Sequence, residues 1–183
     1  MLELSLNILD IAQNSVRAEA KNIVVSVEYS GHDDMLTIIV SDDGVGMDQE
    51  SLMKVTDPFF TTRTTRDVGL GVPFFKMAAE MTGGKFRITS ELGKGTTTTA
   101  RFIYSHIDRV PLGDLAESIG QLICLNEGVE IKFVFRSDGR TFSASTGEFT
   151  ASLDGIPLST PQVMQFVCEY MNENISCIKS DIY

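Results

Sequence analysis

The chain has 183 residues, of which 43% are hydrophobic, so we expect a folded chain with one core, or a compact domain with a smaller one. Its formal net charge of −10 argues against a broad nucleic-acid footprint, because that footprint needs a basic face. The three cysteines show no CxxC spacing and suit a reducing compartment better than a disulfide framework.

The first half of the chain alternates between helical and strand patterns. Helical spacing of apolar residues covers 3–19, and strands are expected at 23–29 and 35–41 on either side of a polar turn. Asp48 is a candidate N-cap for a short helix that ends near residue 55.

The next elements continue this pattern. A stretch without periodicity at 57–68 predicts a mobile loop, and a helix over 72–81 follows with Pro73 in its first turn. Strands at 85–91 and 96–104 then form a second pair around a glycine-rich turn.

Beyond Pro111 the sequence predicts a helix, a hairpin and a further helix, at 112–125, 130–145 and 161–174. The apolar stripe of the last helix is expected to pack into a core, and a partner groove is the alternative. Phe133, Phe135 and Phe142 are expected to face the same small core.

A first candidate site lies on the opening helix, where Asp10, Asn14 and Arg17 share one face. The amide oxygen of Asn14 is a hard ligand suited to Mg²⁺, and the Arg17 guanidinium can fork onto a phosphate. The Asp10 carboxylate can orient or deprotonate a water molecule. A solvated polar face is the alternative, since a surface helix commonly has one.

Three glycine-containing turns follow, at 42–46, 67–71 and 93–96. In the first, a carboxylate at a strand end can accept a hydrogen bond from an adenine amine. In the second, glycines before a helix N-terminus can leave N–H groups free for a phosphate. Each turn alone is also consistent with an ordinary loop.

The order of these elements carries a family resemblance. LDIAQNSVRAEAKNIVVSV, SDDGVGM, DPFFTTR, VGLGV and GKGTTTTARF resemble, in this order, the N, G1, F, G2 and G3 boxes of the histidine-kinase-like ATPase superfamily. That superfamily includes gyrase B, heat-shock chaperones, sensor histidine kinases and mismatch-repair ATPases. The resemblance covers residues 4–104. As a stand-alone module with a TTR loop, the chain also resembles the anti-sigma-factor serine kinases.

The resemblance implies a set of ligand contacts. Mg²⁺ would bind Asn14, phosphates would contact Arg17, and the adenine amine would bond to Asp42. Gly44 and Gly46 would admit adenine, and Thr96 would contact it through water. Gly69, Leu70 and Gly71 would belong to a lid that closes over the phosphates. Phe59 and Phe60 would pack the base of that lid. The implied cofactors are ATP and Mg²⁺.

Two positions depart from the family pattern. Asp10 stands where many members carry a glutamate that activates water, and one methylene less shortens its reach. Asp67 replaces the first glycine often found in the G2 box and adds negative charge near the phosphates. The only histidines, His32 and His106, lie off any expected long helix, so we do not expect self-phosphorylation on histidine.

The implied fold class is α+β: a two-layer α/β sandwich of the Bergerat type, with a mixed and mostly antiparallel sheet. We expect an ATP-binding domain over 1–106 and a smaller α+β module of unknown role over 107–183. With no apolar run of membrane-spanning length and no signal sequence, we expect a cytoplasmic protein that binds neither membrane nor nucleic acid.

Three functions remain open at this point. The chain could be a kinase or ATPase that transfers the γ-phosphoryl group of ATP to a partner protein or to water, with Asp10 as the catalytic residue. It could instead be a non-hydrolysing module that senses ATP or ADP within a larger complex. The third alternative is a degenerate fold that binds no nucleotide. A homodimer is compatible with each.

Overall fold

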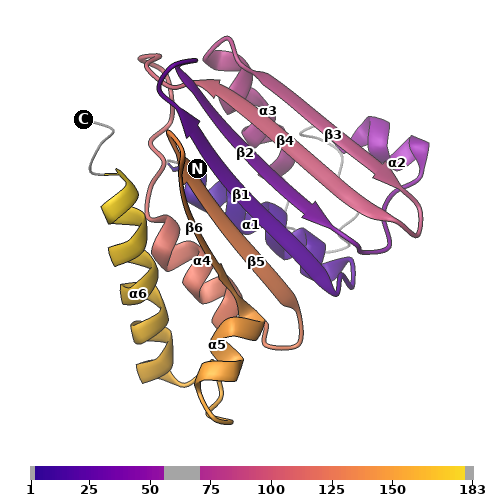
Figure 1. The fold of residues 1–183 in the computed structure, drawn as a ribbon. Coiled ribbons are helices and arrows are strands. Elements are labelled where there is room, and N and C mark those ends of the chain that lie inside the picture. The colour runs from indigo at the N-terminus through magenta and orange to yellow at the C-terminus, as the bar shows by residue number, and fades with distance from the viewer. Residues whose placement is uncertain (1–2, 56–70, 180–183) are drawn as a thin grey trace.

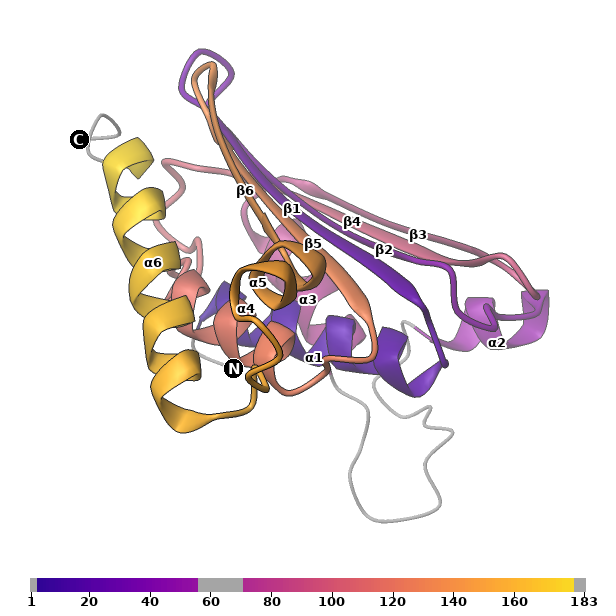
Figure 2. The same ribbon diagram turned by 60° about the horizontal axis from the view of Figure 1, so that its bottom comes forward.

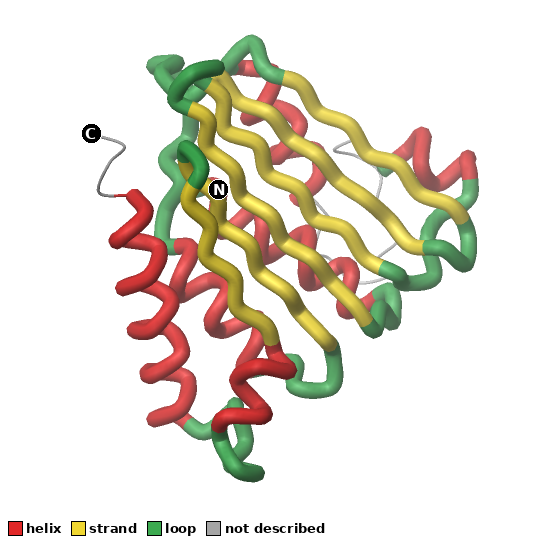
Figure 3. Tube along the Cα trace, in the orientation of Figure 1, coloured by secondary structure: helices red, strands yellow, loops and turns green. Residues whose placement is uncertain are grey.

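In the computed structural model, which describes residues 3–55 and 71–179, the strands form one mixed sheet in the order β3-β4-β2-β1-β5-β6 (Figure 1). The strands are β1 (Asn22–Ser30), β2 (Met35–Asp42), β3 (Lys85–Glu91), β4 (Gly95–Ile103), β5 (Glu130–Ser137) and β6 (Arg140–Ser145). The helices are α1 (Leu4–Arg17), α2 (Gln49–Lys54), α3 (Gly71–Met81), α4 (Leu115–Cys124), α5 (Thr146–Ser152) and α6 (Pro161–Lys179). Figure 3 shows the two layers that they form.

Alternation along the strands gives the sheet one buried face. In β1, Ile23, Val25 and Val27 are fully buried, and the residues between them are partly or fully exposed. The register places Val27 opposite Ile38 of β2 and beside Phe135 of β5, so one row of apolar side chains crosses three strands. The strand pairs expected at 23–41 and 85–104 are confirmed.

The pairing of β5 with β1 joins the two halves of the chain. These two strands are parallel, and the other pairings within the described sheet are antiparallel. The expected mixed, mostly antiparallel sheet is therefore confirmed. The division at residue 106 stays a prediction, while the sheet itself runs across it: the hairpin at 130–145 extends the sheet, and its phenylalanines belong to the common core.

Helices cover one face of this sheet. α1, α3 and α4 lie under it and α6 runs along the β6 side, whereas the opposite face is bare (Figure 2). The α1 side chains that pack inward include Leu4, Ile8, Ile11 and Ala12, each at most 5% exposed. Leu6, part of the helical spacing in the sequence, is instead 42% exposed.

The first turn of α1 is bonded to a segment far along the chain. The Leu4 and Ser5 N–H groups donate to the carbonyl oxygens of Pro111 and Leu112, each at 2.9 Å. These bonds satisfy donors that a helix N-terminus leaves unpaired. They also fix the start of the helix that carries Asn14 and Arg17.

Helix α6 packs only part of the expected apolar stripe into the core. Val163, Val167 and Met171 are buried, whereas Phe166 and Tyr170 are 55% and 40% exposed and stack on each other. Across the described residues, none of the helices has the length and hydropathy to cross a membrane.

Candidate functional site

The Asp42 carboxylate lies at the end of β2 and is held from three directions. Its Oδ2 accepts from Ser15 Oγ at 2.5 Å, and its Oδ1 accepts from the N–H groups of Gly44 at 3.0 Å and Thr96 at 3.2 Å. One donor comes from α1, one from the loop that follows β2, and one from β4. The fold therefore sets the orientation of this carboxylate. A carboxylate offers about four acceptor positions, so one remains for an external donor.

The glycines after Asp42 have an internal packing reason. A Cβ on Gly46 would lie 2.1 Å from the carbonyl oxygen of Glu91, and the φ of Gly46 is +67°. A Cβ on Gly44 would lie 2.6 Å from the Ala18 carbonyl oxygen. Both glycines therefore let the loop close against α1 and the β3–β4 turn.

Asp43, which the motif reading left without a role, secures the same loop from outside. Its carboxylate accepts from the N–H groups of Lys21 and Asn22 at 2.7 and 2.8 Å, and from Asn22 Nδ2 at 2.7 Å. The Asn22 side-chain bond, followed by the backbone bonds, holds the pKa of this carboxyl below its ordinary value. No local sequence pattern shows this role, because the donors on Lys21 and Asn22 lie 22 and 21 residues earlier in the chain.

The polar face of α1 brings Asn14 and Arg17 together. The Arg17 guanidinium donates to Asn14 Oδ1 at 3.0 Å. The oxygen that the resemblance assigns to Mg²⁺ is therefore engaged by Arg17, and a metal at Asn14 requires this bond to open.

Asp10 lies one turn earlier and faces the start of α3. A Cβ on Gly71 would come within 1.8 Å of Asp10 Oδ2, so the carboxylate occupies the space that a side chain at 71 would need. This contact brings together a residue of the first motif and a residue of the second glycine turn. Gly69, Leu70, Phe59 and Phe60 lie outside the described residues.

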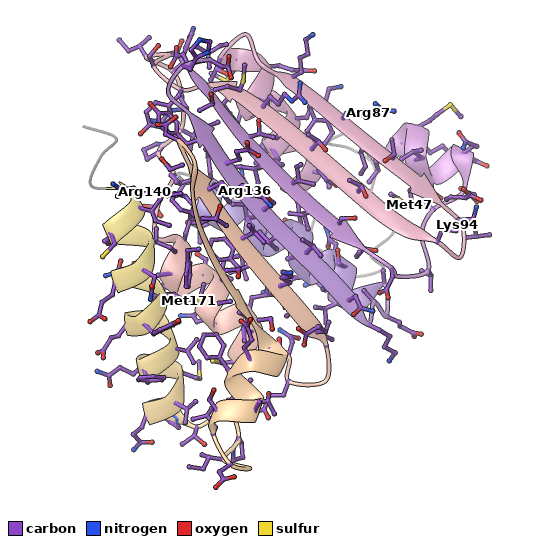
Figure 4. The ribbon with its side chains drawn as sticks, in the orientation of Figure 1. Met47, Arg87, Lys94, Arg136, Arg140 and Met171 are labelled. Atoms are coloured by element: carbon purple, nitrogen blue, oxygen red, sulfur yellow. The ribbon has the colours of Figure 1, made fainter. Side chains whose placement is uncertain are left out.

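The β3–β4 turn closes the other side of the site. The Thr96 hydroxyl is within 2.9 Å of Ser90 Oγ, which also donates to the Gly95 carbonyl oxygen and accepts from the Met47 N–H. Figure 4 shows Met47 and Lys94 at this end of the sheet. The turn is thereby bonded to the loop that follows Asp42.

A pocket of about 490 Å³ opens between these elements. It is lined by Ile11, Asn14, Ser15, Arg17, Ala18, Asp42, Gly46, Met47, Asp48, Ser51, Val55, Val72, Ile88, Leu92, Thr96 and Thr98. Five predicted residues therefore converge on one cavity: Asn14, Arg17, Asp42, Gly46 and Thr96. Asp10, Gly44 and Gly71 are not part of this described lining.

Sequence reasoning missed most of the apolar lining. Ile11, Val72 and Ile88 come from three different elements and reach the same cavity. An apolar slot beside an oriented carboxylate suits a flat base with an exocyclic amine. The strand over 85–91 was expected, but no local pattern shows which of its residues border a cavity.

The donor set also fits a magnesium–nucleotide pair. Among the described residues no cluster of three or more His, Cys, Asp or Glu side chains could hold a metal unaided. Mg²⁺ commonly takes one or two protein ligands and completes its shell with waters and substrate phosphates. Asn14 would be such a ligand.

An oriented carboxylate, an apolar slot and an Asn–Arg pair on one helix define a nucleotide-binding domain on an α/β sandwich. The profile of the "Histidine kinase-, DNA gyrase B-, and HSP90-like ATPase" family matches residues 2–105. The chain belongs to this ATPase family, whose domain binds ATP.

Two curated relatives are kinases that match about half of this chain or a little more. Histidine protein kinase DivJ of Caulobacter vibrioides is 32% identical over 98 residues, which are 51% of this chain and 16% of that protein. Sensor protein kinase FleS of Pseudomonas aeruginosa is 34% identical over 110 residues, 60% of this chain and 27% of FleS. The match thus spans well under a third of either kinase.

A solved structure is similar over more of the chain. The crystal structure of the N-terminal domain of a DNA repair protein superposes with a TM-score of 0.57 at 13% identity, covering 84% of this chain and 57% of that one. At this identity the likeness concerns the fold. The superposition covers 84% of this chain, which is more residues than the family profile matches. The shared fold therefore includes part of the segment after residue 105.

Proposed function

We propose that the protein binds Mg-ATP in the pocket at the end of β2 and transfers the γ-phosphoryl group to a partner protein or to water. The observation that carries this proposal is Asp42, whose three internal donors leave one acceptor position facing a cavity of nucleotide size. The adenine amine would take that position. Thr96, which is bonded to the same carboxylate, would border the base.

The phosphates would then run along the polar face of α1. Arg17 would leave Asn14 and fork onto a phosphate, freeing the Asn14 oxygen for the metal. The metal would supply charge neutralisation between the phosphate oxygens. Gly71, beside Asp10, would belong to the segment that covers the phosphates, with Gly69 and Leu70 preceding it.

Asp10 would hold the attacking water or the acceptor hydroxyl. Its carboxylate faces the start of α3, where the family resemblance expects the lid over the phosphates. A general base at this point contributes about 10²–10⁴-fold to a rate. With a shorter side chain than glutamate, Asp10 would work at the lower end of that range.

A test separates binding from chemistry. The protein is incubated with Mg-ATP labelled at the γ-phosphate, and retained nucleotide, released phosphate and label on the protein or on added candidate partners are measured. We expect Asp42→Asn to weaken ATP binding about tenfold or more, because the amide nitrogen cannot accept the adenine amine bond. We expect Asp10→Asn to keep binding and lose about a hundredfold in turnover.

A second candidate function is a nucleotide-sensing switch without hydrolysis. It is favoured by the absence of Asp10 from the described pocket lining and by the Asn14–Arg17 bond, which ATP would have to open. Tight ATP binding with equal, negligible phosphate release from wild type and Asp10→Asn would support this function against the first.

A further inference from the structure

The bare face of the sheet differs in character from the rest of the molecule. In a strand, successive side chains point to opposite faces, so the neighbours of the buried residues point away from the helices. On this face threonine and serine are the most frequent residues, and aliphatic residues such as Val24 and Ile39 lie among them. We call it the open face (Figure 2).

Five exposed cations lie on the open face: Lys85, Arg87, Arg101, Lys132 and Arg136. The registers place three of the five, Lys85, Arg101 and Arg136, in one row across the sheet. Lys85 lies opposite Arg101, which lies opposite Thr37; Thr37 in turn lies opposite Glu28, and Glu28 beside Arg136. Figure 4 shows the side chains of Arg87 and Arg136 on strands at the two sides of this face.

These cations are not neutralised by the protein. Within the described part of the chain, none of the five forms an ion pair within 4.0 Å. Three acidic side chains share the outward positions of the face. Glu28 lies beside Arg136, Glu91 pairs with Lys94, and Glu130 accepts from the Gly147 N–H, so the five cations still outnumber the acids. The chain has 15 lysines and arginines in all and a net charge of −10, so this face is an exception to the overall charge.

We propose that the open face docks an acidic segment of a partner protein. Its positive charge is complementary to carboxylates, and its hydroxyl groups can bond to a polypeptide without demanding one sequence. Complementary charge speeds encounter and excludes wrong partners, which suits a module that must find a specific partner. The site is separate from the nucleotide pocket, so this proposal does not depend on ATP.

Two other occupants fit the face less well. Single-stranded nucleic acid binds open sheets by stacking bases on aromatic side chains, and the outward positions of the six strands carry no Phe, Tyr or Trp. A second copy of the chain docking face to face would bring the five cations against their own equivalents, and this like-charge contact is unfavourable.

The test uses a labelled peptide of about twenty residues rich in glutamate and aspartate, with binding followed by fluorescence anisotropy at low and high salt. The face variant is Arg87→Gln/Arg101→Gln/Arg136→Gln. The matched control is Lys21→Gln/Lys54→Gln/Lys76→Gln, which removes the same charge from other parts of the surface. Circular dichroism checks that both variants fold.

We expect the peptide to bind the wild type at low salt, to bind the face variant about tenfold or more weakly, and to bind the control within about twofold of wild type. Absence of binding to the wild type at low salt would overturn the proposal, as would equal losses in both variants. The proposal would also be overturned if an oligothymidylate of equal charge, or phosphatidylserine vesicles, bound the wild type more tightly than the peptide does and lost this binding in the face variant.

Discussion

Two adjacent carboxylates in this protein have different tasks because their neighbours differ. Asp42 accepts hydrogen bonds from α1 and β4 and faces the pocket, whereas Asp43 turns outward and bonds to Lys21 and Asn22. Under the proposed function the first would orient the adenine amine, whereas the second fixes the loop that carries the first. At the scale of single residues, the orientation of Asp42 therefore also depends on a neighbour that faces away from the pocket.

Asp43 makes the stability of the protein depend on acid pH. Its hydrogen bonds hold the pKa of the folded carboxyl below that of the unfolded chain. Its contribution is therefore fully present above the unfolded pKa, near 3.9, and is lost as the pH falls through the lower folded pKa. We expect Asp43→Asn to lower the melting temperature at neutral pH and to differ little from wild type in strong acid.

Thermal unfolding between acid and neutral pH measures this effect. Asp154→Asn is the matched control, because it removes an exposed carboxylate from the turn after α5. A difference between wild type and Asp43→Asn that stays constant down to the lowest pH would contradict the prediction.

The contact between Asp10 and Gly71 gives a second prediction at this scale. Gly71→Ala places a methyl group in the space of the Asp10 carboxylate, which must move. Since the obstructing atoms belong to Asp10, the cost should largely disappear in an Asp10→Ala background. A double-mutant cycle of unfolding free energies should give a coupling of about 1 kcal/mol. Additive effects would show that the two residues do not meet.

At the scale of elements, α1 depends on a segment that lies beyond the ATPase region. Its first N–H groups are bonded to Pro111 and Leu112, and α4 packs against it. β1 likewise has β5 as its parallel neighbour. α1 carries Asn14, and β1 pairs with β2, the strand that ends at Asp42, so both parts of the site are supported by residues beyond the motif region.

A chain truncated to residues 1–106, the predicted ATP-binding domain, tests this support. The truncation removes β5 and leaves β1 as an edge strand, whose N–H and C=O groups lose their partners. Buried Ile23, Val25 and Val27 lose the cover of Phe133 and Phe135. We expect a lower melting temperature and a tendency to aggregate, measured by calorimetry and light scattering. Equal stability of the truncated and full chains would show that residues 107–183 are dispensable for folding.

Local pattern predicted the elements well and their partners less well. The Asp48 cap, the strand pairs and the hairpin at 130–145 depend on nearby residues, and each is present. The parallel pairing of Val25 with Phe133 joins strands separated by most of the chain, and no local pattern encodes such a pairing. In the pocket, Asp42 and Asn14 were found through motifs, whereas Ile11 and Val72 required the fold.

At the scale of the whole molecule, one sheet and one apolar core run from β3 to β6. The core includes Phe75 of α3, Phe133 of β5 and Met171 of α6, although these elements lie in different halves of the sequence. Domains with separate cores can unfold separately, but a shared core couples them. A ligand at Asp42 should therefore stabilise segments that it does not touch.

Hydrogen exchange with and without Mg-ATP measures that coupling. At a ligand concentration of about a hundredfold Kd, binding adds about 2.7 kcal/mol to the free energy of unfolding. Amides that exchange only through global unfolding should all slow by the same factor, about a hundredfold. We expect this in Val40 of β2 and equally in Phe133 of β5, because both lie in the same buried row of the sheet. Slowing confined to residues before 106 would show instead that the C-terminal segment opens on its own, and the predicted domain division would then be the better description.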